Sequence, residues 1–222
     1  DLISSPFDNF SLHYALIAAI HRELLIDTAS INMFKQANQA NCIYIFLGVE
    51  SGSEIILKKA NKGYSRDEVI DKVTVAKEAG IAQVNISIII GLPYETKDTI
   101  AETLNLIKLL PCDNAGINIL DIYPGTAVFD MADRGEGGLR WIEGKRMNWG
   151  AYLRAEPMAE VNDVDCKYLK EARQKALRIL AKKSRKKIIS LYKKRWAYFK
   201  EFAKKDKSTL LRKTLDTLRN IK

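Results

Sequence analysis

Two short polar turns hold the residues of this chain whose types and spacing could do chemistry. The first turn is Gly48-Val-Glu-Ser-Gly-Ser53, and the second turn is Gly91-Leu-Pro-Tyr-Glu-Thr96. A glycine lets the backbone approach a ligand closely, and the Glu50 carboxylate can accept hydrogen bonds from hydroxyl groups or an amine. Each turn follows an apolar run, as expected at the carboxyl ends of parallel strands, where α/β folds build binding sites. We therefore predict a ligand site there.

The segments around the two turns alternate between apolar runs and amphipathic helices. The helix between the turns has the clearest signals, because Ser65 and Glu68 form a capping box and Gly80 supplies its end. The run at 42–49 is almost wholly apolar, which is typical of a strand covered on both faces. Strands that alternate with helices predict right-handed crossovers and a parallel sheet. Strands are predicted at 42–49, 81–90 and 117–123, and helices at 28–40, at 65–79 and from Thr96 onward, whereas 11–25 fits either a strand or a helix.

The chain divides into three predicted regions of different composition. Residues 1–130 carry the strand–helix pattern, residues 131–164 form an irregular connecting region, and residues 165–222 form a basic helical tail. From residue 167 to the end there are 21 Lys and Arg against 4 Asp and Glu, whereas the preceding residues carry 15 against 23. The net charges are thus +17 and −8. A solvated helical surface explains such a tail, and so does an anionic partner.

Length and composition exclude several classes of protein. With 222 residues and 47% hydrophobic content the chain can bury a core. No apolar run reaches the ~18 residues of a membrane span, and no signal-peptide pattern opens the chain. Cys42, Cys112 and Cys166 lie 70 and 54 residues apart, which gives neither a disulfide framework nor a CxxC-type metal spacing. We therefore expect a reducing, cytoplasmic location.

Some candidate residues have a simpler structural explanation. For Glu95 and Thr96 we favour a role at the start of the next helix, because such residues commonly lie at helix N-termini. His13 and His21 share no ligand spacing with a cysteine or carboxylate and are expected to be packing or surface residues. The P-loop, GxSxG and HExxH motifs are absent.

The order and spacing of the turns resemble those of the radical S-adenosylmethionine (SAM) enzymes, especially the group that often carries an N-terminal cobalamin-binding domain. The resemblance covers roughly residues 20–127. It implies an α/β fold in which residues 1–130 supply the later strands of a partial TIM-type β/α barrel, followed by the helical basic tail. The segments that carry the resemblance are, in order, Gly48–Ser53, Leu57 with Lys62-Gly63, Lys77-Glu-Ala-Gly-Ile81, Gly91–Thr96 and Pro124-Gly-Thr126.

The resemblance also implies which residues bind SAM. Glu50 would lie near the ribose or the methionine end, and the Lys62 ammonium would reach the SAM carboxylate. Three residues of the second predicted strand and its turn would line the adenine and ribose, largely through their backbone. Arg22 would face the mouth of the active site, although it and Lys62 could instead be ordinary surface cations. The predicted cofactor-binding residues are Glu50, Ser51, Lys62, Ser87, Ile89, Gly91 and Arg22.

The chain departs from this family at the iron–sulfur cluster. Radical SAM enzymes bind a 4Fe-4S cluster through a CxxxCxxC motif, and such clusters need closely grouped thiolates. This sequence has no such motif, so we predict no metal ligand in it. We expect a C-terminal part of a longer protein whose preceding segment holds the cluster and any cobalamin-binding domain. A degenerate relative that folds without a cluster is the alternative.

The predicted function is the SAM-binding portion of a radical SAM enzyme. In the intact protein a reduced cluster would cleave SAM to methionine and a 5′-deoxyadenosyl radical, which would abstract hydrogen from an unknown substrate. This chain alone is expected to be inactive.

The alternative is a non-catalytic module whose basic tail binds RNA or another anionic partner with counterion release. Tyr192, Trp196 and Phe199 recur along that tail and could either pack it onto the body or stack on bases. Binding of the tail to the acidic part of the same chain would explain the charges without any partner.

Overall fold

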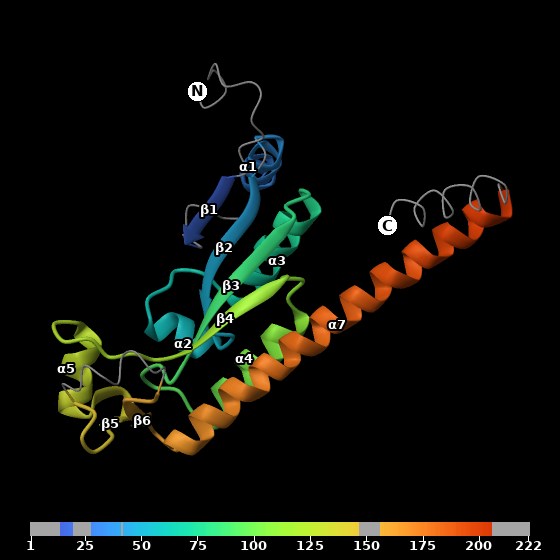
Figure 1. Ribbon diagram of the computed structural model, residues 1–222. Helices are drawn as coiled ribbons and strands as arrows, with labels where there is room; N and C mark the ends of the chain where they lie inside the picture. Colours follow the sequence, from blue (N-terminus) through green and yellow to red (C-terminus); the bar gives the residue numbers. More distant parts are fainter. Residues whose placement is uncertain (1–13, 20–27, 41, 147–155, 206–222) are drawn as a thin grey trace, which may run out of the picture. The chain divides into compact units, whose positions relative to one another are not determined.

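Residues 14–19, 28–40, 42–146 and 156–205 are described by a computed structural model of the chain. Strands and helices alternate through most of this length (Figure 1). Within 11–25, which fits either a strand or a helix, the described residues 14–19 form a strand. The elements are β1 Tyr14–Ala19, α1 Thr28–Gln39, β2 Cys42–Glu50, α2 Glu54–Lys59, α3 Arg66–Glu78, β3 Gln83–Ile90, α4 Lys97–Leu109, β4 Asn114–Ile119, α5 Ala127–Arg134, the 3-10 helix η2 Glu136–Gly138, β5 Leu139–Trp141, β6 Ala159–Val161 and α7 Cys166–Lys205.

The first four strands form one parallel sheet in the order β1-β2-β3-β4. Helix α1 lies between β1 and β2 in the chain, α2 and α3 lie between β2 and β3, and α4 lies between β3 and β4. Consecutive parallel strands joined by helices are the repeating unit of a TIM-type barrel. The predicted fold class, a partial TIM-type β/α barrel followed by a helical basic region, is confirmed.

Helices cover one face of this sheet. From Ile45 to Glu50 of β2 and from Val84 to Ile90 of β3, buried and half-buried residues alternate, whereas Ile43 is exposed. The buried set, which includes Leu47 and Ile86, joins one core with Val69 of α3 and Ile100 of α4. The prediction that residues 42–49 are covered on both faces is therefore wrong. A four-stranded arc does not close on itself, so the face that would line a complete barrel, called here the inner face, keeps its access to solvent.

Capping boxes fix the starts of α3 and α4. The Ser65 hydroxyl accepts a hydrogen bond from the Glu68 N–H, and the Glu68 carboxylate accepts one from the Ser65 N–H. At α4, Thr96 and Thr99 make the equivalent reciprocal pair. Reciprocal caps satisfy backbone donors that a helix leaves unpaired at its first turn. The predicted start of the helix at 65–79 is confirmed, and so is Thr96 as the cap of the next.

The third predicted strand is displaced in the structure. It was expected at 117–123, but β4 runs from Asn114 to Ile119. Pairing begins early because the Asp113 N–H donates to the Val84 carbonyl oxygen at 2.8 Å. It ends early because β3 stops at Ile90 and leaves β4 without a partner. The predicted irregular region at 131–164 also contains two short strands, β5 and β6, which pair antiparallel.

Helix α7 begins where the basic tail was predicted. Its first part packs on the preceding elements through the buried residues Leu169, Ala172 and Ala176. The Arg173 Nε donates to the Ile117 carbonyl oxygen at 2.9 Å. Because β4 is the last strand of the sheet, this bond satisfies a backbone acceptor on its outer edge, where exposed acceptors invite unwanted pairing.

The chain forms two compact units, Asp1–Leu180 and Ala181–Lys222. The predicted boundaries at 130 and 164 stay a prediction. Among the described helices, none has the length and apolar character that a membrane crossing needs.

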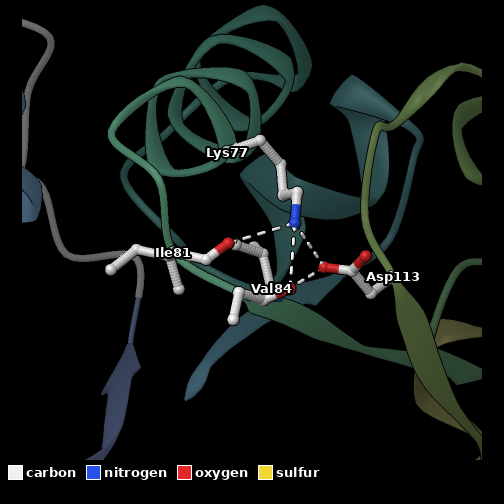
Figure 2. A network of polar contacts seen from close by, with 5 residues as sticks. Lys77, Ile81, Val84 and Asp113 are labelled. Atoms are coloured by element: carbon white, nitrogen blue, oxygen red, sulfur yellow. Dashed lines mark hydrogen bonds and ion pairs between the residues drawn. The ribbon is translucent and has the colours of Figure 1, made fainter. Parts of the chain in front are cut away.

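A polar network holds the amino-terminal end of the sheet (Figure 2). The Lys77 ammonium donates to the carbonyl oxygens of Ile81 and Ala82 and to the Asp113 carboxylate, the last at 2.7 Å. The same Asp113 oxygen accepts the Val84 N–H at 2.8 Å. Both side chains are largely buried. The network thus ties the end of α3 to the first residues of β3 and β4.

Removing the charge of Asp113 should therefore destabilise the fold. We expect Asp113→Asn to lower the free energy of unfolding by about 1–3 kcal/mol, because Lys77 would stay half-buried without its counter-charge. Urea denaturation followed by circular dichroism measures this. Asp71→Asn on the exposed face of α3 is the matched control and should change the value by less than about 0.5 kcal/mol. Equal effects of the two substitutions would contradict the proposed clamp.

Candidate functional site

Glu50 lies at the apex of the first turn in a strained backbone conformation. Its φ is 64°, and the Ser51 N–H donates across it to the Val49 carbonyl oxygen at 2.8 Å. A residue with a side chain held at positive φ costs about 1–3 kcal/mol, and such residues cluster at functional sites. The register of β2 against β3 also shifts between Gly48 and Glu50. The strand therefore ends in a bulge that re-aims the Glu50 side chain.

The Glu50 carboxylate folds back over Gly48. A Cβ atom at Gly48 would lie 2.9 Å from Glu50 Oε1 and 3.9 Å from the Ser87 hydroxyl oxygen. Gly48 and Ser87 are direct neighbours on β2 and β3. Only glycine at position 48 leaves room for the carboxylate in this place. The structure thus brings together two of the predicted site residues, Glu50 and Ser87.

Two side chains from the segment between α2 and α3 complete the surroundings of Glu50. The Lys62 ammonium lies 3.5 Å from Glu50 Oε1. The Tyr64 hydroxyl donates to the carbonyl oxygens of Gly48 and Val49, at 3.0 and 3.4 Å. Burial, and to a smaller extent the Glu50 charge, raise the pKa of Tyr64, so its hydroxyl stays protonated. A cation, a carboxylate and a neutral hydroxyl therefore meet at the end of β2.

Ser51 turns away from this group and into the protein. Its side chain is fully buried and hydrogen-bonds the Thr103 hydroxyl at 3.2 Å. The Gly52 N–H donates to the same Thr103 oxygen at 2.9 Å, and Thr103 itself donates to the Thr99 carbonyl oxygen. A Cβ atom at Gly52 would approach the Thr103 Cα to 2.6 Å. The first turn is thus locked against α4, the helix that follows the second turn.

The second turn is closed by Glu95. Gly91 has a φ of +93°, and its N–H donates to Glu95 Oε2 at 2.6 Å, while the Leu92 N–H donates to the same oxygen at 3.2 Å. Thr96 caps α4, so the helix-capping role favoured for Glu95 is wrong and its carboxylate instead closes the turn. Its Oε1 is buried without a hydrogen-bond partner among the described residues. Burial raises the pKa of Glu95 to about 8, although the two N–H donors oppose the shift.

The two turns lie on the same edge of the sheet. The strands that carry them, β2 and β3, are neighbours. The Lys59 ammonium at the end of α2 lies 4.6 Å from the centre of the Tyr94 ring in the second turn. Tyr94 also has a positive φ, of 69°. The sequence prediction that both turns meet at one carboxyl edge is confirmed by this arrangement.

Polar groups line the inner face below the turns. Asn85, Ser87 and Ile89 alternate along β3 and are half-buried. The Asn85 Oδ1 atom is buried without a hydrogen-bond partner among the described residues. Just after β4, the Asp121 Oδ1 atom is also buried without a hydrogen-bond partner among the described residues. Burial raises the pKa of this carboxyl group. Unpaired buried oxygens are costly, and a ligand that donates hydrogen bonds would satisfy them.

The described residues do not fit an iron–sulfur cluster or another metal centre. None of their His, Cys, Asp and Glu side chains gather in groups of three or more that could hold an ion. Cys42 and Cys112 are buried, and Cys166 is half-buried at the start of α7. An iron–sulfur cluster needs grouped thiolates, which these residues do not provide.

The sequence-predicted residues thus fall into three sets. Glu50, Lys62 and Ser87 come together at the end of β2, and Ile89 and Gly91 follow along β3. Ser51 is engaged with α4, and Arg22 lies outside the described residues. Sequence reasoning missed three further residues, of which Tyr64 had a visible signal in its place beside Lys62 and Ser65. The other two, Thr103 and Asp121, showed none.

Comparison with protein families identifies the barrel part of the chain. The family model described as "Radical SAM superfamily" matches residues 7–107. A curated relative, an uncharacterized methyltransferase of Pyrococcus horikoshii, is 28% identical over 151 residues, which are 68% of this chain and 31% of that protein. A tRNA-2-methylthio-N(6)-dimethylallyladenosine synthase of Pelotomaculum thermopropionicum is 35% identical over 99 residues, 44% of this chain and 22% of that protein. The chain thus spans about a third or less of their lengths.

Solved structures with a similar chain path include the archaeal Methanocaldococcus infernus Elp3. Its similarity has a TM-score of 0.45 at 22% sequence identity and covers 55% of this chain and 28% of that one. Coproporphyrinogen III oxidase from Escherichia coli, described as a radical SAM enzyme, gives a TM-score of 0.43 at 18% identity and covers 50% and 24%.

The buried Glu95 carboxyl group should make stability depend on pH. Its pKa is raised from 4.5 to about 8 in the folded state, so the folded protein holds this proton more tightly than the unfolded chain does. Its contribution to stability is therefore fully present below about pH 4.5 and is lost as the pH rises to about 8. We expect urea midpoints to fall across this range and Glu95→Gln to flatten the fall. Glu102→Gln, on the exposed face of α4, should leave it unchanged, and an equally steep fall in Glu95→Gln would contradict the assignment.

Proposed function

Because residues 7–107 match the radical SAM superfamily, we propose that the carboxyl ends of β2 and β3 bind S-adenosylmethionine. The observation that carries this proposal is the grouping of Glu50, Lys62 and Ser87 beside a glycine that leaves room for the carboxylate. The chain would act as part of a radical SAM enzyme. When bound, SAM would supply the adenosyl group that this class uses for radical chemistry.

The charges of the site match those of an amino-acid ligand. The methionine part of SAM carries an ammonium and a carboxylate on one carbon. Glu50 and Lys62 present a carboxylate and an ammonium 3.5 Å apart, and each could take the opposite charge of the ligand in place of its present partner. Lys62 would then bind the SAM carboxylate, and Glu50 the amine or a ribose hydroxyl.

The adenosyl part would lie along β3. Ser87 and Ile89 face the inner side, and Gly91 turns the chain without a side chain in the way. In this proposal Ser51 acts by holding the first turn against Thr103, and Arg22 keeps its predicted place at the mouth of the site. The wide spacing of the three cysteines along the sequence supports a reducing, cytoplasmic location.

Calorimetric titration of the full chain with SAM tests the charge assignment. Glu50→Gln and Lys62→Met should each weaken binding roughly tenfold, equivalent to about 1.4 kcal/mol, because each removes one charge-assisted contact. Lys58→Met, at an exposed position of α2, is the matched control and should bind as the wild type does. If all three variants bind SAM equally well, the ligand is not held by this pair.

The space beside Gly48 that the Glu50 carboxylate occupies gives an independent test. Gly48→Ala would place a Cβ atom 2.9 Å from Glu50 Oε1 and push the carboxylate away, so SAM binding should weaken while the unfolding midpoint changes little. Gly116→Ala, on β4 of the same sheet, meets nothing closer than 3.9 Å and should leave binding unchanged. Equal affinities of both variants for SAM would count against the placement of Glu50.

A further inference from the structure

One face of α7 in the unit Ala181–Lys222 carries cations and aromatic rings together. A helix turns about 100° per residue, so the residues of this face fall within about 120° of its circumference. All of them are exposed, and the exposed fractions of Tyr192 and Trp196 are 72% and 60%. We call this the aromatic–basic face; its residues are Lys182, Arg185, Lys186, Ile189, Tyr192, Lys193 and Trp196.

The charge of this segment is almost entirely of one sign. Residues 181–205 contain 11 Lys and Arg and a single acidic residue, Glu201. Cations from 182 to 193 follow one another over about 17 Å of helix axis, at 1.5 Å per residue. A line of like charges of this length fits a partner that carries regularly spaced negative charges.

The mixing of rings and cations on one face decides between the possible anionic partners. A helix that lies in a membrane surface buries an apolar face and keeps its cations on the opposite one. Here Lys193 lies three residues before Trp196, and Arg185 lies two turns before Tyr192, on the same face. A second copy of this helix is also disfavoured, because two such segments side by side would repel each other.

We infer that the aromatic–basic face binds single-stranded nucleic acid. Its cations would neutralise backbone phosphates, and the rings of Tyr192 and Trp196 would stack on unpaired bases, as aromatic platforms do in proteins that bind single strands. A row of cations followed by exposed flat rings on the same face matches a polymer that carries both phosphates and bases. This inference does not depend on the proposed SAM site.

The contribution of the cations can be tested with the full chain by fluorescence anisotropy. The probes are a labelled, unstructured oligouridine RNA and the matching oligodeoxythymidine. The triple variant Lys182→Glu, Arg185→Glu, Lys186→Glu should lose most binding and lower the slope of log affinity against log salt by about 2, because about 0.7 is expected per phosphate contact on a single strand. The matched control is Lys170→Glu, Arg178→Glu, Lys175→Glu, which makes the same charge change on exposed residues of the same helix. It should bind much as the wild type does.

The stacking part is tested by Tyr192→Ala and Trp196→Ala, which change no charge. Each should weaken binding between about 5-fold and 150-fold and leave the salt slope as it was, with circular dichroism confirming that the helix persists. Tighter binding of a duplex than of the single strand would overturn the inference. Equal losses of binding in the two triple variants would also overturn it. So would a result in which Tyr192→Ala and Trp196→Ala abolish binding to anionic vesicles, or self-association, but leave RNA and DNA binding intact.

Discussion

The site depends on a backbone contact that admits no side chain. Gly52 packs so closely on Thr103 that a Cβ atom would come within 2.6 Å of the Thr103 Cα and 2.8 Å of the Leu106 Cβ. This contact, with the hydrogen bonds from Ser51 and Gly52, holds the first turn against the helix that follows the second. Ser51 and Gly52, which follow Glu50, are held in place by these contacts, and Glu50 can therefore keep its positive φ.

Two kinds of buried polar group lie at opposite ends of the sheet. At the amino end, the Lys77 ammonium and the Asp113 carboxylate form a network with backbone partners and serve the fold. At the carboxyl end, one oxygen each of Glu95 and Asp121 is buried without a hydrogen-bond partner among the described residues. An α/β barrel places stability and ligand binding at opposite ends in the same way. Buried oxygens without partners at the carboxyl end would suit a ligand that donates hydrogen bonds.

The two units use charge differently. In the barrel unit, opposite charges meet at short range, as in Glu50 with Lys62, and can be exchanged for those of a small ligand. In the tail unit, charges of one sign repeat along a helix and act over a distance set by salt. A small zwitterion needs the first arrangement, whereas a polyanion needs the second. The two proposed surfaces thus suit ligands of different size and charge.

The sequence by itself determined the order of the strands and of α1, α3 and α4 around the two turns, because capping residues and apolar periodicity act over a few neighbouring positions. It also indicated Glu50, Lys62 and Gly91 through their turns. It did not predict the short helix α2. It misjudged Glu95 and gave no sign of Thr103, since the distance from Ser51 to Thr103 is 52 residues along the chain but 3.2 Å in space. The covered and open faces of β2 were likewise decided only by the tertiary structure. Local signals indicate which residues belong to a helix or a strand. Which side chains are buried, and which face of a strand stays open, is decided only when segments distant in the sequence pack together.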